Sequence, residues 1–284
     1  MTLKAVIFDV DGTLAETEEL HRAAFNAAFA EAGLDWSWDR DRYFELLAVE
    51  GGLARMRHYA ETHRPRDLTT MEHAGDFERL HERKQALFVS MIEEGAALRP
   101  GVARLIEDLR SSGIKLAACT TSTRETFEAL ILNAFGIDAL DWFAAVVTRE
   151  DVETVKPDPA PYRLTLQRLG VPPEAAIVIE DSARGVASAS GAGLEVLAAP
   201  GLYTRGEDFS GALLVVSSLG EPHTPFEAIA GDAGPFFHVT ADALQVWHAR
   251  RCTGEGADVV AQCRSALERI ERALWEMPVL SANS

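Results

Sequence analysis

The chain of 284 residues carries 27 lysines and arginines against 44 aspartates and glutamates, which gives a formal net charge of −17. This charge argues against nucleic acid or anionic lipid as a partner, although a pocket with a metal and a few cations can still bind a phosphorylated metabolite. Hydrophobic residues make up 47% of the chain and charged residues 25%, as is ordinary for a globular protein. The length is sufficient for one large core and a second, smaller domain.

No apolar run reaches the roughly 18 residues that a membrane-spanning helix needs, and no signal region stands at the N-terminus. We therefore expect no membrane partner and a cytoplasmic location, or an organelle stroma if a transit peptide has been removed. The cysteines Cys119, Cys252 and Cys263 form neither a zinc-binding pattern nor a disulfide framework, so we expect them to be reduced.

The first predicted strand, from Lys4 to Val10, is apolar and rich in β-branched residues, which is typical of a strand buried on both faces. Asp9 and Asp11 stand two residues apart at its end, so their side chains leave the strand on the same side. Gly12 then breaks the strand pattern. Two carboxylates in such a position are costly unless they bind a cation or perform chemistry.

The next segment, residues 16–97, keeps a helical pattern and never returns to the alternation of a strand. Predicted helices cover residues 24–32, 43–47, 53–62 and 77–92, and residues 64–66 and 69–70 are predicted as loop between helices. We interpret residues 16–97 as an all-helical domain inserted directly after the first strand. The alternative is a plain helical domain without the role of a lid.

Strands and helices alternate from Leu98 onward. Strands are predicted at 115–119, 143–148, 176–179 and 194–198, and helices at 102–110, 124–135, 159–169 and 186–192. This alternation with short connections predicts an α/β fold, in which a doubly wound parallel sheet is covered by helices on both faces. Residues 1–15 and 98–222 would form this core.

Residues 223–284 are predicted as a C-terminal helical extension. Residues 221–225 and 231–235 have the composition of loops, and helical patterns cover 239–247 and 259–275. The extension is expected to pack on the core or to form a dimer contact, so the sequence is compatible with a monomer or a homodimer.

Polar residues recur just after predicted strands, where doubly wound sheets bind ligands. Thr120, Thr121 and Ser122 offer hydroxyl groups and backbone N–H groups that could hold a phosphate, although a helix N-cap is the alternative. Glu180 and Asp181 repeat the pattern of acids at a strand end, and their hard oxygen ligands suit Mg²⁺. We predict Asp181 as the firmer metal ligand and Glu180 as the weaker one.

The stretch Phe8 to Leu14, which reads FDVDGTL, closely resembles the first motif of the haloacid dehalogenase-like (HAD) phosphotransferases. Thr120, Lys156 with Pro157, and Glu180 with Asp181 resemble the later motifs in the expected order. The resemblance implies a HAD Rossmann-like core, and it identifies the helical insert as a C1 cap.

The same resemblance implies a role for each motif residue. Asp9 would be the nucleophile and a side-chain ligand of the metal, and Asp11 would be the acid/base and a ligand through its backbone oxygen. Thr120, the amide of Thr121, and Lys156 would hold the transferring phosphoryl group.

Longer stretches at residues 15–21, 98–102 and 203–212 resemble the CbbY-like proteins, which accompany Rubisco and dephosphorylate its inhibitor xylulose-1,5-bisphosphate. The resemblance implies a Mg²⁺-dependent sugar (bis)phosphate phosphatase that forms an aspartyl-phosphate. One alternative is a sugar phosphomutase of the β-phosphoglucomutase type, which shares the motifs and the cap. The other is a non-catalytic sugar-phosphate sensor.

A sugar bisphosphate requires a second phosphate contact, which the family supplies from a Gly-Gly-Lys-Glu-Arg-like cap loop. This chain has Gly51 and Gly52 in the corresponding loop but Leu53 in place of the lysine. The substitute cations would be Arg55, Arg57 or Lys84. Near the cap hinge, Glu16 and His21 are expected to contact sugar hydroxyls or to orient Asp11.

Overall fold

The computed structural model describes residues 2–253, and within this range one seven-stranded sheet has the order β3-β2-β1-β4-β5-β6-β7. The strands are β1 (Ala5–Phe8), β2 (Lys115–Cys119), β3 (Phe143–Val147), β4 (Ala176–Glu180), β5 (Glu195–Ala198), β6 (Leu214–Val216) and β7 (Ala228–Ala230). The pairs from β3 to β6 are parallel, and only β7 joins in the antiparallel direction. The predicted α/β class is therefore confirmed, with one antiparallel edge strand added.

Strand β1 lies in the centre of the sheet and is fully buried, as its apolar sequence predicts. Val6 and Phe8 point into one hydrophobic cluster, whereas Ala5 and Ile7 point into a second cluster on the other face of the sheet. The alternation of side chains along a strand gives each face its own core.

The register of the sheet brings the ends of its central strands to one edge. Phe8 is the partner of Ala118 in β2 and of Ile179 in β4. The residues that follow these partners along the three strands, among them Asp9, Thr120 and Glu180, therefore meet at the carboxyl edge of the sheet.

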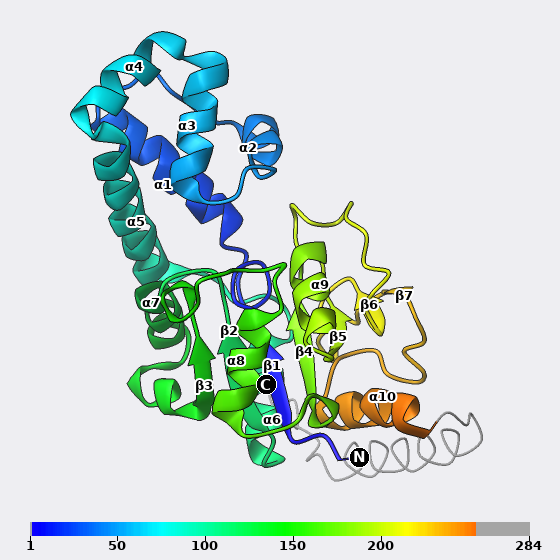
Figure 1. The fold of residues 1–284 in the computed structure, drawn as a ribbon. Helices are drawn as coiled ribbons and strands as arrows, with labels where there is room; N and C mark the ends of the chain where they lie inside the picture. Colours follow the sequence, from blue (N-terminus) through cyan, green and yellow to red (C-terminus); the bar gives the residue numbers. More distant parts are fainter. Residues whose placement is uncertain (1, 254–284) are drawn as a thin grey trace, which may run out of the picture.

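Helices cover both faces of the sheet (Figure 1). They are α6 (Val102–Ser111), α7 (Arg124–Phe135), α8 (Ala160–Leu169), α9 (Ala183–Gly191) and α10 (Ala241–Thr253), with 3-10 turns η1 (Ile137–Trp142), η2 (Arg149–Asp151) and η3 (Pro173–Ala175). Helix α9 begins three residues before its predicted start because the Ser182 hydroxyl accepts a hydrogen bond from the Gly185 amide and caps the helix.

Five helices between β1 and α6 form the helical insert, residues 18–95. They are α1 (Glu18–Glu31), α2 (Arg40–Leu46), α3 (Gly52–His63), α4 (Pro65–Ala74) and α5 (Asp76–Gly95). Figure 1 shows α1 to α4 beyond the sheet, with α5 running back towards it. The loop predicted at 64–66 and 69–70 was wrong, because most of it belongs to α4. Pro65 opens that helix, a position where proline loses no hydrogen bond.

The insert has a hydrophobic core of its own, separate from the two clusters on the sheet. Its centre is aromatic, with Phe25, Phe29 and Trp38 buried and in ring contact. Such aromatic packing explains how a set of short helices becomes stable next to the sheet.

The described part of the C-terminal extension packs on the core. Trp247 of α10 is buried and donates a hydrogen bond to the carbonyl of Ala233, and His248 contacts the Glu195 carboxylate at 2.7 Å. Edge strands β6 and β7 were not predicted. The helix expected at 259–275 lies outside the described residues. Among the residues that are described, no helix combines the length and apolar character needed to cross a membrane.

Candidate functional site

Asp9 follows β1 directly and is buried, with 6% of its surface exposed. Its Oδ1 accepts a hydrogen bond of 2.7 Å from the Lys156 ammonium, but its buried Oδ2 has no hydrogen-bond partner among the described residues. Burial raises the pKa of Asp9 to about 7; Lys156 opposes this shift and Glu180 adds to it. An unpaired buried carboxylate oxygen indicates a site made for a further positive group.

Glu180, at the end of β4, has both carboxylate oxygens engaged. Oε1 accepts hydrogen bonds from Lys156 at 2.7 Å and from the Tyr162 hydroxyl at 2.9 Å. Oε2 accepts from the amides of Asp181 and Ser182 at 3.0 and 3.2 Å. Gly185 must be a glycine because a Cβ there would collide with this carboxylate. Glu180 thus holds Lys156 and the turn before α9 in place.

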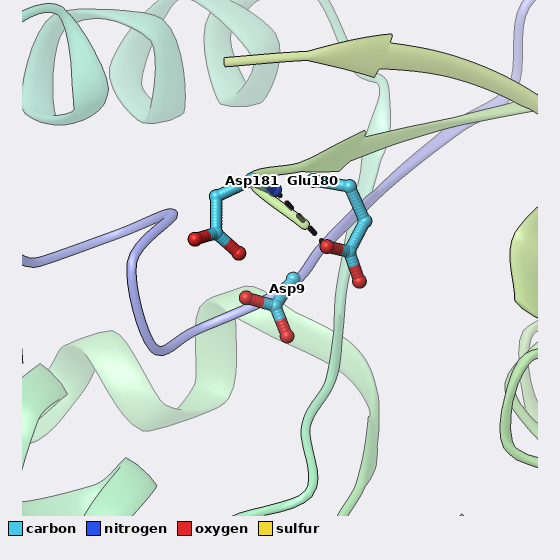
Figure 2. A group of neighbouring side chains, drawn as sticks. All are labelled: Asp9, Glu180 and Asp181. Carbon is cyan, nitrogen blue, oxygen red and sulfur yellow. Dashed lines mark hydrogen bonds between the residues drawn. The ribbon is translucent and has the colours of Figure 1, made fainter. Parts of the chain in front are cut away.

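Asp181 completes an acidic cluster with Asp9 and Glu180, in which one oxygen of each lies within 4.8 Å of the others (Figure 2). Burial, together with the charges of Asp9 and Glu180, raises the pKa of Asp181 well above its ordinary value. Gly12, at φ +81°, passes so close to Asp181 that any Cβ would collide with the carboxylate.

The cluster fits a divalent cation on two independent observations. Oδ2 of Asp9 lacks a partner in the described part of the chain. Burial, with the neighbouring carboxylates adding to it, raises the pKa values of Asp9 and Asp181, and a bound cation would oppose this shift. Since Glu180 is already fully hydrogen-bonded, Asp9 and Asp181 offer the freer ligand atoms.

Asp11 lies outside that cluster and is surrounded by hydroxyl donors. Its carboxylate accepts hydrogen bonds from Thr17 at 2.7 Å, Ser122 at 2.6 Å and Thr120 at 3.3 Å. Burial alone would raise the pKa of Asp11, but His21, Ser122 and Thr17 outweigh it and hold the pKa below its usual range. Asp11 is therefore an ionised carboxylate at neutral pH.

His21, on α1, connects Asp11 with the helical insert. Its Nε2 lies 3.8 Å from Asp11 Oδ1, and its Nδ1 lies 2.6 Å from the Lys84 ammonium. Burial and the charge of Lys84 lower the pKa of His21. When Lys84 is charged it can only donate to Nδ1, and a neutral imidazole then carries its proton on Nε2, on the side of Asp11.

A cavity of about 780 Å³ opens above the strand ends and reaches the insert. The predicted site residues in its wall are Asp9, Asp11, Glu16, Gly51, Arg55, Thr121, Lys156 and Asp181. Arg55 is largely engaged, because its guanidinium donates to the carbonyls of Leu46 and Val49 and to the Tyr43 hydroxyl. Gly52 and Lys84 are not part of the described wall.

Sequence reasoning missed several residues that support this site. Tyr162 fixes Glu180, Thr17 fixes Asp11, and the buried Arg99 donates to the carbonyls of Gly12, Ala199 and Pro200. The stretch at residues 98–102, which resembles the CbbY-like proteins, contains this arginine, but its burial and its partners depend on the fold.

Comparisons with known proteins identify the family and the relatives of this chain. Residues 3–193 match the model of the haloacid dehalogenase-like hydrolases. Protein CbbY of Cereibacter sphaeroides is 44% identical over 77% of this chain and 94% of the relative, and the phosphorylated carbohydrates phosphatase of Thermotoga maritima is 34% identical over 68% and 83%. The crystal structure of a CbbY variant from Rhodobacter sphaeroides with xylulose-1,5-bisphosphate is 42% identical, with a TM-score of 0.68 over 76% and 94%.

Proposed function

Because the chain belongs to the haloacid dehalogenase-like hydrolase family, we propose that it is a phosphatase that hydrolyses a sugar bisphosphate, foremost xylulose-1,5-bisphosphate. The chemistry of this proposal rests on Asp9, a buried carboxylate. One of its oxygens accepts a hydrogen bond from Lys156, and the other has no partner among residues 2–253. The substrate is supported by the solved complex of a 42% identical CbbY with that bisphosphate.

In the proposed first step, an oxygen of Asp9 attacks phosphorus and the bond from phosphorus to the sugar oxygen breaks. The products are an aspartyl-phosphate and a sugar hydroxyl. Lys156 lies 2.7 Å from Asp9 and favours the ionised form of the nucleophile, while it neutralises charge on the phosphoryl oxygens. The hydroxyl of Thr120 and the amide of Thr121 would hold those oxygens.

Asp11 carries the proton in both steps. It donates a proton to the leaving sugar oxygen and later removes one from the water that cleaves the aspartyl-phosphate. Its hydrogen bonds keep it ionised in the free protein, so it must first gain a proton. The negative charge of an incoming phosphate raises the pKa of a nearby carboxyl and so favours this uptake.

The cofactor in this proposal is Mg²⁺, held by the carboxylates of Asp9 and Asp181 and by the backbone oxygen of Asp11. When bound, the ion screens the repulsion between Asp9 and the phosphate dianion. Glu180 would contribute mainly by fixing Lys156 and the Asp181 amide. We also propose that residues 16–97 act as a cap, because the cavity lies between the strand ends and this insert.

The test is phosphate release from xylulose-1,5-bisphosphate and a panel of sugar monophosphates, with the Asp9→Asn variant and with excess chelator. We expect Asp9→Asn to lose at least about 10⁴-fold in turnover, a barrier increase of roughly 5 kcal/mol. Chelator should abolish activity, and added Mg²⁺ should restore it. Full turnover in Asp9→Asn would refute the mechanism.

The same panel separates the alternatives. A preference for a monophosphate would refute the bisphosphate assignment and leave the phosphatase standing. Isomerisation of a hexose phosphate that depends on glucose 1,6-bisphosphate would instead show a phosphomutase. Absence of any turnover, with retained binding of the sugar phosphate, would identify a sensor.

A further inference from the structure

The charged side chains of the cavity wall limit where a second phosphate group could bind. Its wall carries more acidic than basic side chains, and Lys156 is committed to Asp9 and Glu180. A second phosphate would therefore need a cation elsewhere in the wall. Among the described lining residues, the remaining cations are Arg55, Arg149 and Arg184.

The sequence-predicted substitutes are poorly placed for this task. Leu53 packs against the aromatic core of the insert, and Arg57 pairs with Glu78 outside the cavity. Lys84 is buried between His21 and two phenylalanine rings, and burial lowers its pKa to about 7. The Arg55 guanidinium already donates hydrogen bonds to neighbouring groups of the insert.

Arg184 is placed differently, because it belongs to α9 of the core and reaches across the cavity. Its Nη2 donates to the backbone carbonyl of Lys156 at 2.5 Å and lies 2.6 Å from the Glu50 carboxylate of the insert. Both charged side chains are about half exposed, at 45% and 53%. The pair thus joins the loop of the reaction-centre lysine to the opposite wall.

The Glu50 carboxylate binds the Arg184 guanidinium in the way that a phosphate group would. An exposed carboxylate adds little net stability to such a pair, whereas a phosphate dianion can accept two parallel hydrogen bonds from a guanidinium. Helix α3 starts two residues after Glu50 without a side-chain cap, and Gly51 lies in the cavity wall. Free N–H groups at a helix start favour an anion at the same place.

From this geometry we infer that Arg184 binds the second phosphate of the substrate, and that Glu50 is the internal anion which that phosphate displaces. The inference rests on the proposed bisphosphatase function and extends it, because it moves the specificity contact from the cap loop to the core. Arg184 and Glu50 then set the preference for bisphosphates in opposite directions.

The test compares kcat/KM for xylulose-1,5-bisphosphate with kcat/KM for p-nitrophenyl phosphate, which has no second phosphate. We expect Arg184→Ala to lower the ratio of the two about 30-fold and Arg184→Lys to lower it less, because lysine keeps the charge without the fork. Glu50→Gln should raise the ratio about threefold. Arg149→Ala is the matched control, an arginine of the same wall bonded to the carbonyl of Val152, and should keep the ratio within about twofold.

Each contrary outcome has its own meaning. If Glu50→Gln lowers the ratio as Arg184→Ala does, the pair is only a structural link between insert and core, and the inference is wrong. An unchanged ratio in Arg184→Ala, or an equal loss in Arg149→Ala, also overturns it. A wild-type enzyme without any bisphosphate preference overturns the proposed substrate and the inference together.

Discussion

Two lysines are buried in the described part of this protein, one at the strand ends of the core and one within the helical insert. Lys156 donates hydrogen bonds to Asp9 and Glu180, each at 2.7 Å, and to the carbonyl of Cys119 at 2.8 Å. Burial by itself would lower the pKa of Lys156, but the two carboxylates outweigh it and raise the pKa well above its ordinary value.

Lys84 is as deeply buried, but no carboxylate of the described residues forms an ion pair with it. Its ammonium meets His21 Nδ1 and the Gln85 side-chain oxygen, and it lies 4.7 Å from the ring centres of Phe25 and Phe88. Burial lowers the pKa of Lys84 to about 7, and the more distant Glu18 restores only part of the charge.

The comparison shows that neighbours, rather than burial, decide what a buried lysine can do. Lys156 is a permanent charge and is therefore suited to phosphoryl chemistry. A neutral Lys156 would leave the carboxylates of Asp9 and Glu180 buried without a cation, which would destabilise the folded protein. Lys84 is a hydrogen-bond donor that is half neutral near pH 7. This difference explains why Lys84 is a poor candidate for the second phosphate, although its residue type suggested the role.

The largest effect is expected from Lys156→Met, which leaves the carboxylates of Asp9 and Glu180 buried without their shared cation. Removing one partner of a buried ion pair costs about 3–5 kcal/mol of stability, and we expect turnover to fall at least about 10³-fold. Denaturant unfolding and phosphate release measure the two losses. Lys115→Met, at an exposed lysine of β2, is the control and should cost under about 1 kcal/mol. Equal losses in both variants would show that the buried ion pairs of Lys156 contribute no more than an exposed lysine does.

Lys84→Met is expected to have a smaller effect that depends on pH. The folded pKa of about 7 lies below the unfolded value of 10.5, so between these values the unfolded state binds more protons and wild-type stability rises with pH. The penalty of the buried charge is therefore complete below pH 7 and is relieved above it.

Unfolding free energies of wild type and Lys84→Met at pH 6 and pH 9 provide the measurement. The wild type should gain roughly 2–3 kcal/mol on the variant between these pH values, because each pKa unit is worth about 1.4 kcal/mol. A difference that stays constant with pH would mean that Lys84 is charged throughout, as Lys156 is.

The strands and helices of the α/β core could largely be predicted from the sequence. Strand β2 and helix α7 have the predicted bounds, the latter because Thr123 caps its start and Gly136 ends it. Asp9, Thr120 and Glu180 could be placed together because parallel strands end at the same edge. The surroundings of Lys84 could not be predicted, since they depend on how α1 and α5 pack.

Other features could not be predicted from the sequence, for physical reasons. Helix α4 starts at a proline, which in isolation indicates a loop as readily as a helix start. Strands β6 and β7 have only three residues each, too few to show a periodic pattern. The Arg184–Glu50 pair joins residues far apart in the chain, so only the fold reveals it.

The smallest effect is expected from Tyr162→Phe, which changes only one neighbour of Lys156. The Tyr162 hydroxyl donates to Glu180 Oε1 at 2.9 Å, and the buried ring lies 4.9 Å from the Lys156 ammonium. Phenylalanine keeps the ring and removes one hydrogen bond, so we expect a loss of about 1 kcal/mol and a turnover reduced less than about fivefold. Because Lys156 still donates to Oε1 in this variant, Glu180 retains its charged partner. A loss as large as that of Lys156→Met, measured by the same unfolding and turnover assays, would show that the hydroxyl and not the ion pair holds Glu180.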